Sequence, residues 1–240
     1  MTGEPFYDAA IVGFGPTGAT LANLLARGGL DIAVVDAARE IYDKPRAITL
    51  DHEVMRIFQA CGCAHAIAPL TAPHPGTRYL GVDGRVIKKF DPLPPPHPLG
   101  WPPTVTFVQP ELEALLRAGV ADARNVDILL GEPVVAFAQD GEGVTLTLRE
   151  RPSLRARYLL ACDGANSFVR RELNVPLEDL VRRVVVGGRR PAHRGSRAAE
   201  KMHPVLLAVA PGHFRPRSRQ SAPMGDQDAA RRNAGGIRTG

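Results

Sequence analysis

The residues of this chain best suited to do chemistry lie in a glycine-rich loop near its beginning. Gly13, Gly15 and Gly18 have the spacing G-x-G-x-x-G, and Pro16 and Thr17 stand before the third glycine. In loops of this kind the first glycine makes a tight turn, the second lets the backbone approach a pyrophosphate, and the third permits close packing of a helix on a strand. The spacing therefore predicts a phosphate-binding loop, with a purely structural glycine turn as the alternative.

The segments around this loop match the strand, turn, helix and strand of a βαβ unit. Residues 8–12 form an apolar run typical of a buried strand, residues 17–27 place leucines at helical spacing, and residues 31–35 form a second apolar run. Asp36 ends that second run, where a carboxylate can bind ribose hydroxyls. Residues 7–36 are therefore predicted to form a dinucleotide-binding unit, in which the helix N-terminus attracts phosphate.

A second glycine-bearing turn follows another apolar run, at residues 157–161. It contains Cys162, Asp163 and Gly164 and leads into a short helical segment. A carboxylate and a bare glycine backbone at the carboxyl end of a strand can approach a second part of the same ligand, because ligands of open α/β sheets lie there. The alternative is a strand-to-helix turn capped by Asp163.

Several segments resemble the flavoprotein aromatic hydroxylases, and specifically the 3-(3-hydroxyphenyl)propionate hydroxylase branch of that family. The resemblance covers about residues 7–180 and implies an FAD cofactor, NADH or NADPH as co-substrate, and hydroxylation of a phenolic aromatic acid by O₂. Besides the two glycine turns, it is carried by Pro45-Arg46-Ala47, Gly100-Trp101-Pro102, Phe107-Val108-Gln109-Pro110 and residues 167–176.

The resemblance also implies roles for three further residues. Arg46 and Gln109 would contact the flavin cofactor, and Val134 would lie near the adenine. On the residues alone, Arg46 is equally a solvated loop charge and Gln109 a residue at a helix N-terminus. His52 departs from the family, which has Asp-Asp-Glu where this chain has Asp-His-Glu. The candidate cofactor-binding residues are Gly13, Gly15, Pro16, Thr17, Gly18, Asp36, Arg46, Gln109, Val134, Asp163 and Gly164.

The third fingerprint of that family, a Gly-Asp segment, does not occur after residue 180, and neither does most of its substrate domain. We therefore assign no catalytic residue and expect an incomplete, weakly active or inactive chain. From about Val181 onward Arg, Ala, Gly and Pro dominate, which suggests an out-of-frame reading of GC-rich coding sequence. Sequencing the gene tests this hypothesis, since family-like sequence in another frame would support it and an unrelated downstream region would contradict it.

The fold class predicted is α/β, a Rossmann-like FAD-binding domain with a parallel sheet over residues 1–180. A helix is expected at about residues 52–60 with Asp51 as its N-cap, and another beginning near Pro110. A strand is expected at residues 126–130.

Two hairpins are expected in addition. Proline-rich residues 71–108 are expected to form an inserted β-piece of an incomplete substrate domain, with a hairpin around Asp83-Gly84. A second hairpin surrounds the QDGEG turn within residues 133–148. Residues 181–240 are a basic, low-complexity tail expected to be mostly disordered, and its apolar runs have no clear partner strand.

Charge is distributed unevenly along the chain. Residues 181–240 hold 13 Lys and Arg against 3 Asp and Glu, so the net charge of this tail is +10. Because the net charge of the whole chain is +5, residues 1–180 carry a net charge of −5. A basic tail raises the alternative of an RNA-binding protein. Phe214 is the tail's one aromatic residue, so base-stacking sites are not apparent and no nucleic-acid partner is expected.

Other features bound the function further. The three cysteines lack C-x-x-C spacing and the histidines are scattered, so no metal site is indicated. The sequence shows neither a signal peptide nor an apolar run of membrane-spanning length, so a cytoplasmic protein is expected. The family resemblance implies that it acts on a small aromatic molecule. The alternatives are an NAD-dependent dehydrogenase, which does not account for the Asp163-Gly164 turn, and a non-catalytic nucleotide-binding protein.

Overall fold

The computed structural model describes residues 6–44, 46–81 and 83–178, together with the backbone of residues 207–209. Its largest sheet has six strands in the order β8-β2-β1-β11-β10-β9. These strands are β1 (Phe6–Val12), β2 (Ile32–Asp36), β8 (Val126–Leu130), β9 (Val134–Gln139), β10 (Val144–Leu148) and β11 (Leu154–Ala161).

Four neighbouring strands of this sheet, β8, β2, β1 and β11, run parallel. Strands β10 and β9 continue the sheet in antiparallel fashion, since a hairpin joined by a short turn cannot be parallel. The predicted α/β class with a parallel sheet is confirmed, and so is the hairpin around QDGEG.

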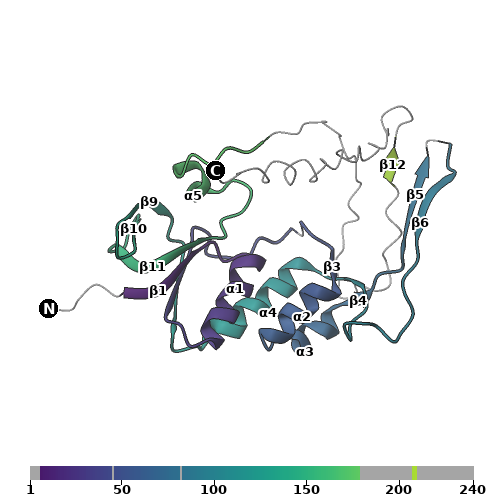
Figure 1. The fold of residues 1–240 in the computed structure, drawn as a ribbon, viewed down its shortest axis with the longest axis horizontal. Coiled ribbons are helices and arrows are strands. Elements are labelled where there is room, and N and C mark those ends of the chain that lie inside the picture. Colours follow the sequence, from purple (N-terminus) through teal and green to yellow (C-terminus); the bar gives the residue numbers. More distant parts are fainter. Residues whose placement is uncertain (1–5, 45, 82, 179–206, 210–240) are drawn as a thin grey trace, which may run out of the picture.

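The alternation of side chains along β1 and β2 divides the core between the two faces of the sheet. Ile11 and Val34 face the helices, whereas Val12 and Val35 face the opposite side. On the helical side lie α1 (Pro16–Arg27), α2 (His52–Ala60), α3 (Ala64–Ile67), the single turn η1 (Ala68–Leu70) and α4 (Gln109–Ala121) (Figure 1). The other face is covered in part by α5 (Phe168–Glu172), through Val169.

Helix α4 is fixed against α1 by a buried asparagine. The Asn23 side chain donates from Nδ2 to the Ala19 carbonyl at 2.8 Å and to the Leu116 carbonyl at 2.7 Å. A Cβ on Gly119 would collide with the side chain of Asn23, so the two helices approach closely there. This contact sets the position of the α4 residues discussed below.

Most predicted boundaries agree with the structure within two residues. Asp51 caps α2 as expected, because its carboxylate accepts from the Val54 amide at 2.9 Å. Strand β11 begins at Leu154, three residues earlier than the apolar run indicates. Arg155 lies among the three added residues, and this polar residue hid them from a search for continuous apolar sequence.

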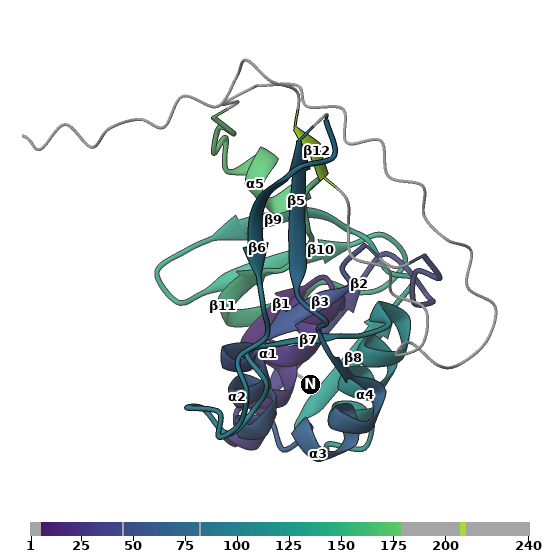
Figure 2. The ribbon, with the colours of Figure 1, turned by 90° about the vertical axis from the view of Figure 1, so that its right-hand side faces the viewer.

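Between residues 71 and 108 the chain forms short strands that belong to two small sheets. One has the order β3-β7-β4 and includes β3 from residues 49–51, and in the other β5 and β6 form the expected hairpin, which projects away from the helices (Figure 2). The strands are β3 (Thr49–Asp51), β4 (Ala72–Pro73), β5 (Thr77–Gly81), β6 (Val86–Phe90) and β7 (Thr104–Thr106).

The expectation of a disordered tail falls on residues outside those described, with one exception. Strand β12 (Leu207–Val209) pairs in parallel with β5, so this apolar run has a partner strand that the sequence did not reveal. Among the described helices, none combines the length and the apolar character needed to cross a membrane.

Candidate functional site

Three loops meet where the parallel strands β1, β2 and β11 end. The Gly13 amide donates to the Val35 carbonyl at 2.8 Å, and the Cys162 amide donates to the Val12 carbonyl at 2.7 Å. These bonds tie together the carboxyl ends of three neighbouring strands, the edge at which open α/β sheets bind ligands. The prediction that the two glycine turns meet at one sheet edge is confirmed.

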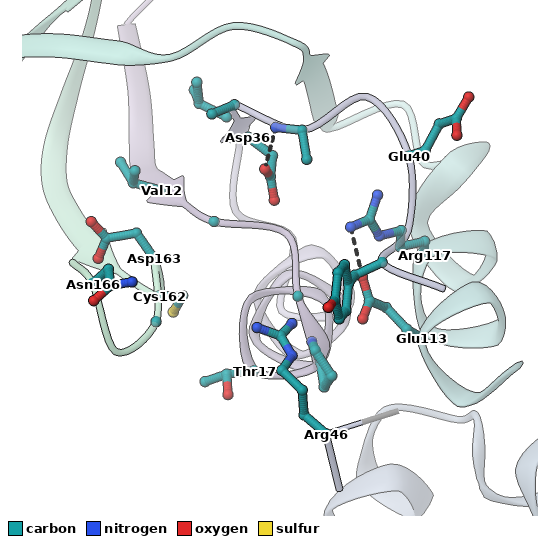
Figure 3. Close-up of a pocket in the computed structure, with 18 of the residues that line it drawn as sticks. Val12, Thr17, Asp36, Glu40, Arg46, Glu113, Arg117, Cys162, Asp163 and Asn166 are labelled. Atoms are coloured by element: carbon teal, nitrogen blue, oxygen red, sulfur yellow. Dashed lines mark hydrogen bonds and ion pairs between the residues drawn. The ribbon is translucent and has the colours of Figure 1, made fainter. Parts of the chain in front are cut away.

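A cavity of about 690 Å³ lies at this edge. Figure 3 shows side chains facing it from several directions: Asp36 from the end of β2, Asp163 and Asn166 from the turn after β11, and Glu113 and Arg117 from α4. All predicted cofactor residues except Gly18 line the cavity, namely Gly13, Gly15, Pro16, Thr17, Asp36, Arg46, Gln109, Val134, Asp163 and Gly164.

The three glycines of the first loop have different surroundings. Gly13 has a φ of +99°, and a Cβ on it would collide with the Cys162 carbonyl. A Cβ on Gly18 would collide with the Gly13 carbonyl, so Gly18 packs the helix under the loop. At Gly15 a Cβ would meet no protein atom within 4 Å, and this residue lines the cavity. The loop therefore leaves space on its cavity side and none on its protein side.

The carboxylate of Asp36 organises the cavity wall beside this loop. Its Oδ2 accepts from the Phe14 amide at 2.6 Å and its Oδ1 accepts from the Ala38 amide at 2.7 Å. The Asp36 carbonyl accepts from the Glu132 amide at 3.0 Å, which brings the start of β9 and Val134 to the same wall. Each carboxylate oxygen has a second lone pair with which to accept a ligand hydroxyl.

Gln109 holds the arginine loop at the cavity. Its Oε1 accepts from the Arg46 and Ala47 amides, both at 2.8 Å, and Gln109 itself is 6% exposed. The Arg46 guanidinium lies over the Tyr42 ring, 5.3 Å from its centroid. The structure thus brings Gln109 and Arg46 together and gives Gln109 a clear positioning role.

The turn after β11 serves two purposes. The Asp163 Oδ2 accepts from the Val169 amide at 3.1 Å, and the Ser167 hydroxyl caps α5 by accepting from the Arg170 amide at 2.9 Å. Asp163 therefore supports the helix and lines the cavity at once. Burial raises the pKa of the Cys162 thiol, and the neighbouring Asp163 carboxylate raises it further, so this cavity thiol stays protonated near neutral pH.

Helix α4 contributes two cavity residues that the sequence analysis did not single out. Arg117 Nη2 lies 2.7 Å from Glu113 Oε1, and their side chains are 13% and 3% exposed. With Gln109 they follow one another every four residues, which places all three on one face of the helix. That spacing was the available signal, but a Glu–Arg pair four residues apart is more often an exposed surface pair. Further cavity residues that the sequence analysis missed are Glu40, Phe107, Glu132, Asn166 and Phe168.

Comparison with known proteins identifies the fold and its ligand class. The model of the family described as "FAD binding domain" matches residues 7–187. The chain is 40% identical over 175 residues to 3-(3-hydroxy-phenyl)propionate/3-hydroxycinnamic acid hydroxylase 1 of Burkholderia vietnamiensis, and 39% identical over 175 residues to the corresponding hydroxylase of Escherichia coli. Each alignment includes 71% of this chain but 28% and 31% of those relatives, so the chain spans less than a third of their length.

Solved structures agree with this assignment. The flavin-dependent monooxygenase PieE, in a complex with FAD and substrate, superimposes with a TM-score of 0.63 and 26% identity over 72% of this chain and 33% of that protein. The p-nitrophenol 4-monooxygenase PnpA of Pseudomonas putida DLL-E4 has the same fold, with a TM-score of 0.63 and 23% identity over 71% of this chain and 44% of that protein. This chain belongs to the FAD-binding monooxygenase family, and its residues 7–187 match the FAD-binding domain of that family.

Proposed function

We propose that this domain binds FAD, with the ADP half on the Gly13–Gly18 loop and beside Asp36. The observation that carries the proposal is the open cavity face of Gly15, where no side chain would stand between the backbone and a ligand. Helix α1 begins there without a side-chain cap and without an acidic residue in its first turn. Its free amides are therefore available to phosphate oxygens.

The remaining candidate residues complete the cradle. The Asp36 carboxylate would accept from ribose hydroxyls, and Val134 would border the adenine beside it. Arg46, positioned by Gln109, would face the rest of the cofactor from the other side of the cavity. When bound, FAD would supply the redox chemistry by which a nicotinamide-reduced flavin and O₂ hydroxylate a phenol, while the protein orients the reactants and excludes water.

The reaction of the whole protein is part of the same proposal. We infer an NADH- or NADPH-dependent hydroxylase of a phenolic aromatic acid such as 3-(3-hydroxyphenyl)propionate, acting in the cytoplasm. The sequence identity of 39–40% to 3-(3-hydroxy-phenyl)propionate/3-hydroxycinnamic acid hydroxylases supports this substrate class. With FAD-saturated protein, nicotinamide oxidation and chromatography of the products test it. Nicotinamide oxidation without a hydroxylated product would contradict the substrate class, and formation of the hydroxylated product would contradict the expectation of an inactive chain.

Binding of FAD is tested with purified full-length protein by quenching of flavin fluorescence. Gly15→Ala should weaken binding by about tenfold or more, equivalent to about 1.4 kcal/mol, because its methyl group would occupy the space of the closest ligand approach. Gly141→Ala is the matched control. A methyl group on Gly141 would also meet no protein atom within 4 Å, but Gly141 lies in the β9–β10 turn and does not line the cavity.

The two variants separate the possible outcomes. The proposal expects both to melt at the temperature of the unaltered protein, and only Gly15→Ala to lose affinity for FAD. Equal affinity in all three proteins would contradict the placement of the ADP half. Tight binding of NAD with no binding of FAD would favour the dehydrogenase alternative instead.

A further inference from the structure

The Glu113–Arg117 pair is a buried ion pair placed against a cavity rather than inside a core. Both side chains line the cavity, and Figure 3 shows them projecting from α4 toward the space beside the glycine loop. Such a pair is costly to desolvate and contributes little stability beyond what apolar residues of similar size would give. Its position therefore calls for an explanation other than stability.

Not all hydrogen-bond donors of Arg117 have a partner within the described part of the chain. Its Nη2 bonds Glu113, but its buried Nε has no hydrogen-bond partner there. The guanidinium lies over the Phe14 ring, 4.8 Å from its centroid. A buried donor left without an acceptor is unfavourable, and a ligand oxygen that accepts from it would remove that penalty.

The place of Arg117 in the cavity wall indicates what kind of ligand oxygen this is. The lining residues include two guanidinium groups, Arg46 and Arg117, against five carboxylates. Phe14, on which Arg117 stacks, belongs to the glycine loop, and its amide donates to Asp36. Arg117 thus lies on the part of the wall where the phosphate-binding loop meets the proposed ribose partner. An oxygen that accepts hydrogen bonds is the complement of the unpaired Arg117 donor at this part of the wall.

We propose that Arg117, held in orientation by Glu113, donates hydrogen bonds to an oxygen of the ADP half of the bound dinucleotide. The acceptor is a phosphate oxygen or a ribose hydroxyl, both of which take guanidinium donors. This inference rests on the proposed function, because it names a further binding residue of that same cavity. Glu113 is a positioning residue in this arrangement, since it acts through Arg117.

The test compares the affinities of FAD, ADP and adenosine for the full-length protein by isothermal titration calorimetry. Arg117→Met keeps much of the apolar stem and removes the donors, and should weaken FAD and ADP binding by about tenfold to a hundredfold. Arg124→Met removes the same charge from an exposed residue beyond the end of α4, outside the cavity, and should leave both affinities unchanged.

A second variant guards against a folding defect. Arg117→Met alone leaves the Glu113 carboxylate buried without its cation, which destabilises proteins strongly. The double variant Glu113→Gln/Arg117→Met removes both charges and should melt at or above the temperature of Arg117→Met. It should retain the loss of ADP affinity, because that loss comes from the missing donors and not from unfolding.

The outcomes are distinct. Weakened ADP binding with unchanged adenosine binding supports a phosphate acceptor, and equal weakening of both supports a ribose acceptor. Unchanged FAD and ADP affinities in both Arg117 variants would overturn the inference while leaving the proposed function intact. Binding of ADP without FAD by the unaltered protein would overturn the proposed function but not the role of Arg117, and binding of neither would overturn both.

Discussion

At the scale of single residues, the cavity separates positions that shape the fold from positions that face a ligand. Gly13 and Gly18 are constrained by contacts with protein backbone, since a side chain on either would strike a carbonyl group. Gly15 meets no such constraint and has an ordinary φ of −68°. Substitutions at the first and third glycine should therefore disturb folding, whereas Gly15 is the position at which ligand binding can be altered alone.

Gln109 offers a sharp test of positioning by one side chain. Gln109→Ala removes the acceptor of the Arg46 and Ala47 amides and should lower the free energy of unfolding by about 1–3 kcal/mol. Hydrogen exchange measured by mass spectrometry should show lost protection at these two amides. Gln109→Glu, which keeps an acceptor oxygen at the same place, should preserve the protection.

Gln59→Ala serves as the control for this experiment. Gln59 is exposed, and its Oε1 accepts from Arg56 and Trp101 at the protein surface. Its loss should leave the Arg46 and Ala47 amides as protected as before. Fast exchange of those amides in the Gln59 variant, or unchanged exchange in Gln109→Ala, would contradict the role given to Gln109.

How much of the site the sequence predicts depends on how local the evidence is. The glycine loop and Asp36 could be predicted from the sequence, because their geometry is determined within one βαβ unit. The role of Arg117 could not be predicted from the sequence, because its burial follows from the packing of α4 on α1. That packing depends on Asn23, whose partner Leu116 is 93 residues away. The stacking of Arg117 on Phe14 likewise joins segments about a hundred residues apart.

At the scale of helices and strands, length decided what could be predicted. β1, β2, β8 and α1 are long enough to carry a hydrophobic period, and their positions were predicted from it. β3, β4 and β7 have two or three residues each and exist because of pairing, as between Thr49 and Thr106. No local pattern in two or three residues distinguishes such a strand from a loop.

Strand β1 provides a pH-dependent test of how the sheet is held together. The Tyr7 hydroxyl of β1 donates to Asp127 Oδ2 of β8 at 2.6 Å, across β2. Burial, followed by the hydrogen bond to Asp127, raises the pKa of Tyr7 from 10.0 to about 12. The folded state therefore favours the neutral phenol, and its stabilising effect is complete below pH 10 and is lost as the pH rises toward 12.

Tyr7→Phe should remove this dependence. In urea unfolding between pH 9 and 12, the free energy of unfolding of the unaltered protein should fall more steeply than that of Tyr7→Phe. Tyr158→Phe, which alters an exposed phenol on β11, is the control and should follow the unaltered protein. Identical slopes for the unaltered protein and Tyr7→Phe would show that the Tyr7–Asp127 bond does not persist in solution.

At the scale of the whole molecule, the cavity is a product of the complete domain. Its lining begins at Val12 and ends at Phe168, and it draws on β1, β2, α1, α4, the start of β9 and the turn after β11. No shorter segment contains the site. All residues that line the cavity lie within the first 180 residues, which are the mildly acidic part of the sequence.

A ligand that needs all these segments at once binds the folded state and not the unfolded one. FAD at a free concentration about a hundredfold above its Kd should therefore raise the free energy of unfolding by about 2.7 kcal/mol, and the melting temperature should rise with FAD concentration. Because the rise depends on the cavity, binding that is tenfold weaker in Gly15→Ala should reduce it to about 1.4 kcal/mol at the same FAD concentration, and Gly141→Ala should leave it unchanged. If fluorescence showed FAD bound while the melting temperature stayed constant, FAD would have to bind the unfolded chain equally well, and the cavity at the sheet edge would not be its site.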